Sequence, residues 1–228
     1  MCLSATVSFS AGALLVVGGG FAITKAWQIN KRYLPVALMP LFAGFQQLLE
    51  GGVWMGVNAG DPNTTLVNAL GYIFFTWFMW PFWIPVATYL LEPPESRRKP
   101  MMLAMAVAGL AFGLALYIPH LLNPDWVEVS VNRDSLAYEG TMILDYLMPR
   151  PMTYFIYLFL IVVPPAISTY LHMRWFALTL VAVIVVDILF LRYAYISFFC
   201  ILAGLGTLHL IYIIVRNKCA RECPVLFA

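Results

Sequence analysis

Polar and charged side chains stand at helical spacing within one otherwise apolar segment. Gln46, Gln47 and Glu50 recur with Ala43 and Trp54 at intervals of three and four residues. This spacing places two amides, a carboxylate and an indole on one face of a helix. An ionised acid near the middle of a bilayer costs about 2.5–3.5 kcal/mol, so we expect this face to point into a helix bundle, with Glu50 as a titrating or ligating group. An interhelical hydrogen-bond clamp would use the same residue types and is the alternative.

Four more polar residues are expected at a similar depth in the membrane. They are Ser4, His120, Asp187 and Cys200. Together with the face of Glu50, they could line one outward-facing cavity that binds a ligand. The competing interpretation is structural, because Asp187 would be solvated near an interface and His120, after a proline, would end a helix.

Two residues suggest more specific chemistry. Cys2 would stand beside a free α-amine if Met1 were removed, and a stabilised thiolate there would be a candidate catalytic nucleophile. His209 lies in the last apolar stretch and could complete a proton path with Glu50, since histidine titrates near neutral pH. An ordinary small residue and a hydrogen-bonded packing residue are the respective alternatives.

Several chemistries lack the residues that they require. A retinal protein needs a lysine within a span for its Schiff base, and the lysines here all fall between the apolar stretches: Lys25, Lys31, Lys99 and Lys218. No two histidines stand at the i, i+4 spacing of a zinc protease, and none are matched in depth as haem ligands would be. We therefore expect no metal site, and the sequence does not identify a cofactor.

The composition identifies the class of protein. Of the 228 residues, 62% are hydrophobic and 11% are charged, and the mean hydropathy is +0.85. A soluble domain carries about 25% charged residues, so this chain lacks the charge needed to coat a globule in water. The net charge of +2 is too small for a nucleic-acid surface. We expect an all-α membrane protein whose main partner is the lipid bilayer, with no nucleic acid bound.

Seven apolar stretches predict a seven-transmembrane helix bundle that forms a single integral membrane domain over residues 1–228. They lie near residues 8–26, 34–57, 66–91, 101–122, 152–171, 175–191 and 195–215. Most approach the roughly 20 apolar residues that a spanning helix needs, whereas a β-barrel would show shorter, alternating segments. Alternating valines from Val127 to Val131 predict a small β-hairpin in the loop between the fourth and fifth helices.

The basic residues predict the orientation of the bundle. Lysine and arginine are in excess in cytoplasmic loops. With the N-terminus outside and the C-terminus in the cytoplasm, Arg133, Arg150 and Arg192 are the outer residues among the 13 Lys and Arg. The other basic residues then all face the cytoplasm, as an odd number of spans requires.

The N-terminal region resembles a known family. The sequence opens Met-Cys-Leu-Ser-Ala, continues into a glycine-rich stretch, and carries Gln46-Gln47-Leu48-Leu49-Glu50-Gly51 followed by Trp54. It is similar to a family of uncharacterised bacterial multi-span membrane proteins that begin Met-Cys-Phe-Ser-Ala and carry Gln-Gln-x-x-Glu-Gly in the second helix. Leu3 departs from the usual aromatic residue, whereas Phe199-Cys200 resembles the family's aromatic-Cys pair. The resemblance implies a fold, a bacterial inner membrane location and a candidate site, but no reaction.

We therefore expect an outward-facing polar pocket around Gln46, Gln47 and Glu50 that binds or transports a small solute, ion or proton. One alternative is a membrane-embedded enzyme that uses Cys2. Another is a structural subunit of a homo-oligomer or a larger membrane complex, joined through faces of small residues such as Gly109 and Gly113.

Overall fold

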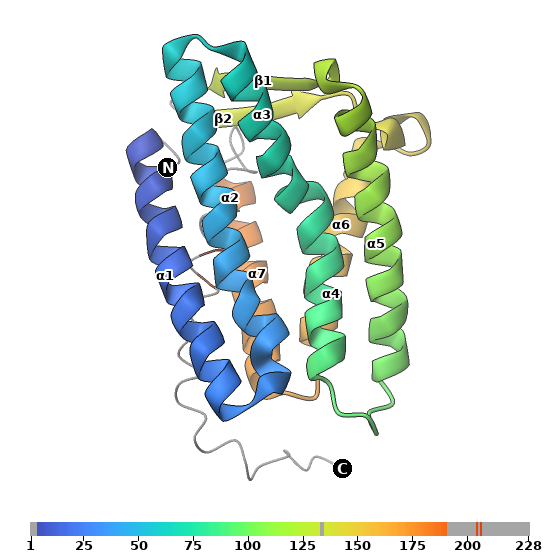
Figure 1. Ribbon diagram of the computed structural model, residues 1–228. Helices are drawn as coiled ribbons and strands as arrows, with labels where there is room; N and C mark the ends of the chain where they lie inside the picture. The colour runs from blue at the N-terminus through green and yellow to red at the C-terminus, as the bar shows by residue number, and fades with distance from the viewer. Residues whose placement is uncertain (1–3, 133–134, 191–203, 205, 207–228) are drawn as a thin grey trace.

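The protein is mostly helical, and its helices stand side by side in a bundle (Figure 1). The computed structural model describes residues 4–132, 135–190, 204 and 206. The helices are α1 (Ala5–Ile29), α2 (Leu34–Ala59), α3 (Pro62–Ile73), α4 (Trp80–Leu91), α5 (Lys99–Leu122), α6 (Arg150–Ala166) and α7 (Leu171–Phe190). A π-helical segment, Phe74–Met79, joins α3 to α4 in one continuous rod.

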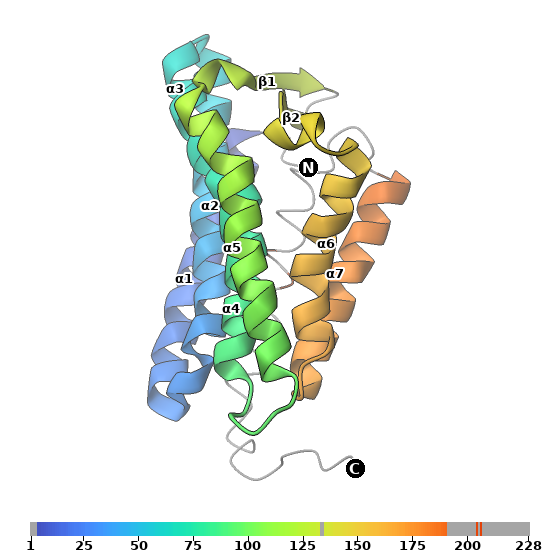
Figure 2. The ribbon, with the colours of Figure 1, turned by 90° about the vertical axis from the view of Figure 1, so that its right-hand side faces the viewer.

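A two-stranded antiparallel hairpin covers one end of the bundle (Figures 1 and 2). Strand β1 (Val127–Asn132) pairs with β2 (Ser135–Gly140), in a register that runs from Val127 opposite Gly140 to Asn132 opposite Ser135. The predicted hairpin is confirmed. We call this the hairpin end. The opposite end, called the basic end, carries Lys25, Lys31, Arg32, Arg97, Arg98, Lys99 and Arg174.

Within the part of the chain that the structure describes, three helices are long and apolar enough to cross a membrane, and they indicate a multi-pass membrane protein. They are Ala5–Ile29, Pro62–Leu91 and Lys99–Leu122. Helices α6 and α7 are shorter apolar helices. The 26-residue α2 is not one of the three, because two glutamines and a glutamate lower the hydropathy of its central turns. The predicted seventh stretch, 195–215, lies outside the described residues except for 204 and 206.

Local sequence signals set the helix boundaries. Ser4 caps α1, since its Oγ accepts a hydrogen bond from the Val7 N–H at 3.4 Å. Gly60 ends α2 in the left-handed region, at φ 63°. Helix α6 stops at Ala166, after Pro164 and Pro165, and not at the predicted residue 171. The prediction ran too far because Ile167 to Tyr170 are uncharged, although they form the connection to α7.

Glycines bring neighbouring helices into close contact. On α1, a Cβ at Gly12 would lie 2.8 Å from Leu48 of α2, and one at Gly19 would lie 2.6 Å from the backbone nitrogen of Leu41. On α5, a Cβ at Gly109 would lie only 2.0 Å from the carbonyl oxygen of Pro81. The four-residue repeat of small residues on α5 therefore serves packing within the chain, against α4.

We expect Gly109→Ala to destabilise the fold by about 1–3 kcal/mol, because the added methyl group meets a rigid backbone carbonyl and not a flexible side chain. The measurement is thermal unfolding of the detergent-solubilised protein. The matched control is Gly20→Ala, where a Cβ meets nothing within 4 Å. Equal melting temperatures for the two variants would contradict the packing described for α4 and α5.

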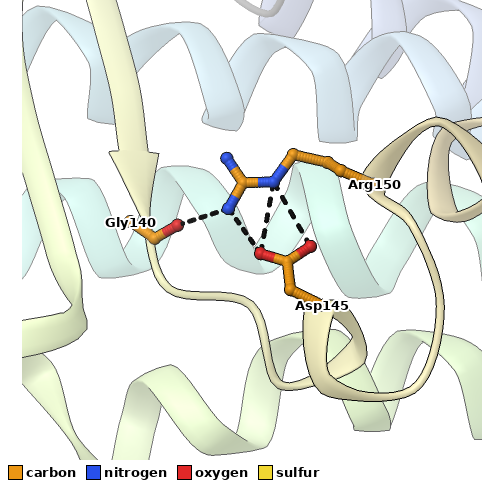
Figure 3. A network of polar contacts seen from close by, with 3 residues as sticks. All are labelled: Gly140, Asp145 and Arg150. Carbon is orange, nitrogen blue, oxygen red and sulfur yellow. Dashed lines mark hydrogen bonds and ion pairs between the residues drawn. The ribbon is translucent and has the colours of Figure 1, made fainter.

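Arg150, the first residue of α6, ties the hairpin to the bundle (Figure 3). Its Nη2 donates to the carboxylate of Asp145 at 2.5 Å and to the carbonyl oxygen of Gly140 at 3.0 Å. Gly140 has φ 153°, and a Cβ there would lie 1.9 Å from the carbonyl oxygen of Trp126, so only glycine fits. Hydrogen bonding to Arg150, assisted by its charge, holds the pKa of Asp145 below the usual range.

This shift predicts a pH-dependent contribution to stability. A carboxyl whose pKa is lower in the folded state stabilises the fold above its unfolded pKa, about 3.9, and loses that contribution as the pH falls through the folded pKa. The pair is partly exposed, so Asp145→Asn should cost at most about 1 kcal/mol at pH 7. The difference in melting temperature between wild type and Asp145→Asn should shrink below about pH 4. A difference independent of pH would contradict the pairing.

Candidate functional site

The polar residues of α2 lie in the interior of the bundle. Gln46 is 1% exposed, and Gln47 and Glu50 are 0% exposed. Ala43 and Trp54, on the same helical face, are also buried. The spacing of these residues along α2 thus corresponds to one buried face, as a 3.6-residue period requires.

Gln46 is the centre of a hydrogen-bond network between helices. Its Nε2 donates to the hydroxyl oxygen of Thr76 at 2.7 Å, and its Oε1 accepts from the indole N–H of Trp80 at 2.7 Å. Thr76 and Trp80 belong to the rod that contains α3 and α4, so one amide joins that rod to α2. Both ends of the amide are paired, and this is what allows a glutamine to be buried.

The partner of Gln46 lies in a break of the backbone hydrogen-bond pattern. In the π-helical segment, the N–H of Trp80 donates to the carbonyl oxygen of Phe75, five residues back. The same register would pair the carbonyl of Thr76 with residue 81, which is proline and has no N–H. The hydroxyl of Tyr157, from α6, donates to that carbonyl oxygen at 2.7 Å. A side chain from a third helix therefore replaces a missing backbone donor beside Gln46.

His120 joins an aromatic group near the hairpin end and not the network of Gln46. Its ring centroid lies 4.4 Å from that of Trp77 and 6.2 Å from that of Trp126. Nδ1 lies 2.8 Å from the carbonyl oxygen of Leu116, and since a carbonyl only accepts, Nδ1 carries the proton. The ring is 0% exposed.

The other predicted residues are only partly placed. The structure uses Ser4 as the cap of α1. Asp187 falls in the last turn of α7, whereas Cys2, Cys200 and His209 lie outside the described residues. The cavity expected to unite Ser4, His120, Asp187 and Cys200 with Glu50 therefore stays a prediction. The proton path through His209 and the catalytic role of Cys2 also stay predictions.

A second buried carboxylate, Glu92, was not among the sequence candidates. It follows the last residue of α4 and is 1% exposed. The hydroxyls of Ser96, Ser168 and Thr169 donate to its carboxylate, at 2.7 Å for Ser96 and 3.0 Å for Ser168, and the N–H of Thr169 donates at 3.1 and 3.2 Å. Through these hydrogen bonds, Glu92 holds the connection between α6 and α7 against the basic end of α4.

The sequence did carry a signal for these residues. Thr76, Trp80, Thr88 and Glu92 stand at multiples of four along the rod, and all four are buried. The five aromatic residues from 77 to 83 mask this polar spacing in the sequence. Glu92 is followed by two prolines, so it resembles an ordinary loop residue.

Burial also affects the phenol of Tyr33, which precedes α2 at the basic end. Its ring centroid lies 5.5 Å from that of His172 and 6.4 Å from that of Tyr170. Desolvation, with a smaller contribution from Tyr170, raises the pKa of Tyr33 to about 12. Tyr33 is therefore a neutral phenol at physiological pH.

These features define a helical protein with candidate membrane spans and a buried polar network centred on α2. The chain belongs to a family of unknown function, DUF6629, whose model matches residues 1–224. Neither a curated protein nor a solved structure matches the chain. The resemblance to a family of unknown function is confirmed, and it extends over nearly the whole chain.

We expect Tyr157→Phe to lower the free energy of unfolding by about 1–3 kcal/mol, because it leaves the buried Thr76 carbonyl without its donor from α6. Thermal unfolding in detergent is the measurement. Tyr89→Phe is the matched control, since the Tyr89 hydroxyl forms no hydrogen bond among the described residues. If Tyr157→Phe were no less stable than Tyr89→Phe, the Tyr157 hydroxyl would not be replacing the missing backbone donor as described.

Proposed function

We propose that the protein is a seven-helix protein of a bacterial inner membrane that binds or transports a small solute, ion or proton. Glu50 is the titrating or ligating group, and Gln46 and Gln47 stand beside it. The observation that carries the proposal is the complete burial of Glu50 on a helix face whose neighbour, Gln46, contacts a π-helical, proline-interrupted rod. Such segments recur at functional sites, and an ionisable residue inside a membrane is a functional candidate by default.

The proposed orientation places the hairpin end outside and the basic end in the cytoplasm. It is supported by the charge of the two ends, since among the described residues Arg150 is the one arginine or lysine at the hairpin end. The predicted seventh span, 195–215, which follows α7 in the sequence, would pass close to the face of α2 that carries Glu50. In support, a Cβ at Gly204 would lie 3.1 Å from Leu15 of α1 and 3.4 Å from Ala43, which shares the face of Glu50.

The small residues of α2 and α5 give little support to the alternative of a structural subunit. Gly109 and Gly113 contact the rod of α3 and α4, and Gly52 and Gly56 contact Asn68 and Thr65 of α3. These small residues are thus occupied within the chain and are not available as a face for self-association. The enzyme alternative depends on Cys2, which lies outside the described residues.

The test is ion flux in proteoliposomes that contain dyes for protons, sodium or potassium. We expect wild type to dissipate an imposed gradient of at least one of these ions. Glu50→Gln should reduce that flux about tenfold or more while it keeps the melting temperature, because the amide preserves the shape but neither titrates nor carries charge.

Glu95→Gln is the matched control, because it makes the same chemical change at an exposed position of the basic end. It should keep wild-type flux. Wild-type vesicles no leakier than empty ones, or equal flux in Glu50→Gln, would contradict the role of Glu50.

A further inference from the structure

A polar pocket lies at the hairpin end, apart from the α2 network. Its volume is about 440 Å³, within the range of small-molecule sites. The hairpin, the segment after it and the first turns of α6 supply its lining: Glu128, Tyr138, Gly140, Thr141, Met142, Arg150 and Tyr154. None of these residues belongs to the site around Glu50, so the pocket does not depend on the function proposed above.

The charges of this pocket do not balance. Arg150 donates to Asp145 through both Nε and Nη2, so an adjacent carboxylate cancels the arginine charge (Figure 3). Glu128 is exposed, and it forms no ion pair among the described residues. The pocket therefore carries one uncompensated negative charge, which attracts a cation.

Two tyrosines supply the aromatic part of the lining. Tyr138 is 5% exposed, and its ring stacks on Tyr72 of α3 with a centroid distance of 4.4 Å and an interplanar angle of 12°. The stacking on a fully buried ring fixes the position of Tyr138 before any ligand binds. Tyr154, one turn into α6, is half-buried. An acid combined with aromatic rings is the arrangement that recognises organic cations, through charge attraction and cation–π contact.

We propose that the hairpin-end pocket binds a small organic ammonium ion, with Glu128 as its counter-ion and Tyr138 and Tyr154 as its aromatic walls. The ion pair between Arg150 and Asp145 positions the pocket, because it fixes the Gly140 carbonyl and the start of α6. A metal ion is a poorer fit, since Glu128 is the one carboxylate in the lining and the described residues contain no cluster of metal ligands.

The experiment is calorimetric titration of the full chain in lipid nanodiscs with choline. The reference ligand is its neutral isostere, in which carbon replaces the ammonium nitrogen. We expect choline to bind more tightly than the isostere, and added salt to weaken the binding. Glu128→Gln should weaken choline binding about tenfold or more, and Tyr154→Leu should weaken it more than Tyr154→Phe does.

Asp125→Asn is the matched control, because it removes an acidic charge at the same end but outside the pocket lining. It should leave choline binding unchanged. Unfolding temperatures verify that each variant is folded. No choline binding, equal binding of the neutral isostere, or unaltered affinity in Glu128→Gln would overturn the proposal.

Discussion

The architecture depends on pairing the polar groups that an apolar bundle encloses. Pro81 has no backbone N–H to donate within the rod of α3 and α4. In the π register, the carbonyl oxygen of Thr76 would accept from residue 81, so it lacks a backbone donor. Tyr157 of α6 supplies the missing donor, and Gln46 of α2 bonds the side chains of Thr76 and Trp80. A single interrupted turn thus connects three parts of the bundle, because inside a membrane no water is present to satisfy these groups.

Glu50 and Glu92, both buried, occupy contrasting environments. Glu92 ends a helix, and donors from two connections surround its carboxylate, so it is suited to holding the basic end together. Glu50 lies within α2, on the same buried face as Gln46, whose amide bonds to the neighbouring rod. Several donors around one carboxylate, as at Glu92, serve stability, whereas an ionisable residue inside a membrane is by default a candidate for function.

The sequence predicted what depends on local periodicity. The helices follow from long apolar stretches. The hairpin at 127–140 follows from a spacing of two residues, and the shared face of Gln46 and Glu50 from spacings of three and four. The contact of Tyr157 with Thr76 joins residues 81 positions apart, and no local pattern encodes it. The π register and the hydrogen bonds to Glu92 were not predicted from the sequence for the same reason, since both depend on which helices become neighbours.

The proposed function requires Glu50 to exchange a proton or a ligand inside the bundle. Dicyclohexylcarbodiimide tests it most directly, because this apolar reagent reaches membrane interiors and modifies a carboxyl only in its protonated form. Mass spectrometry of the labelled peptides identifies the modified residue. We predict labelling at Glu50 that is faster at lower pH. Labelling at Glu92 with none at Glu50, or at neither residue, would contradict the proposed function.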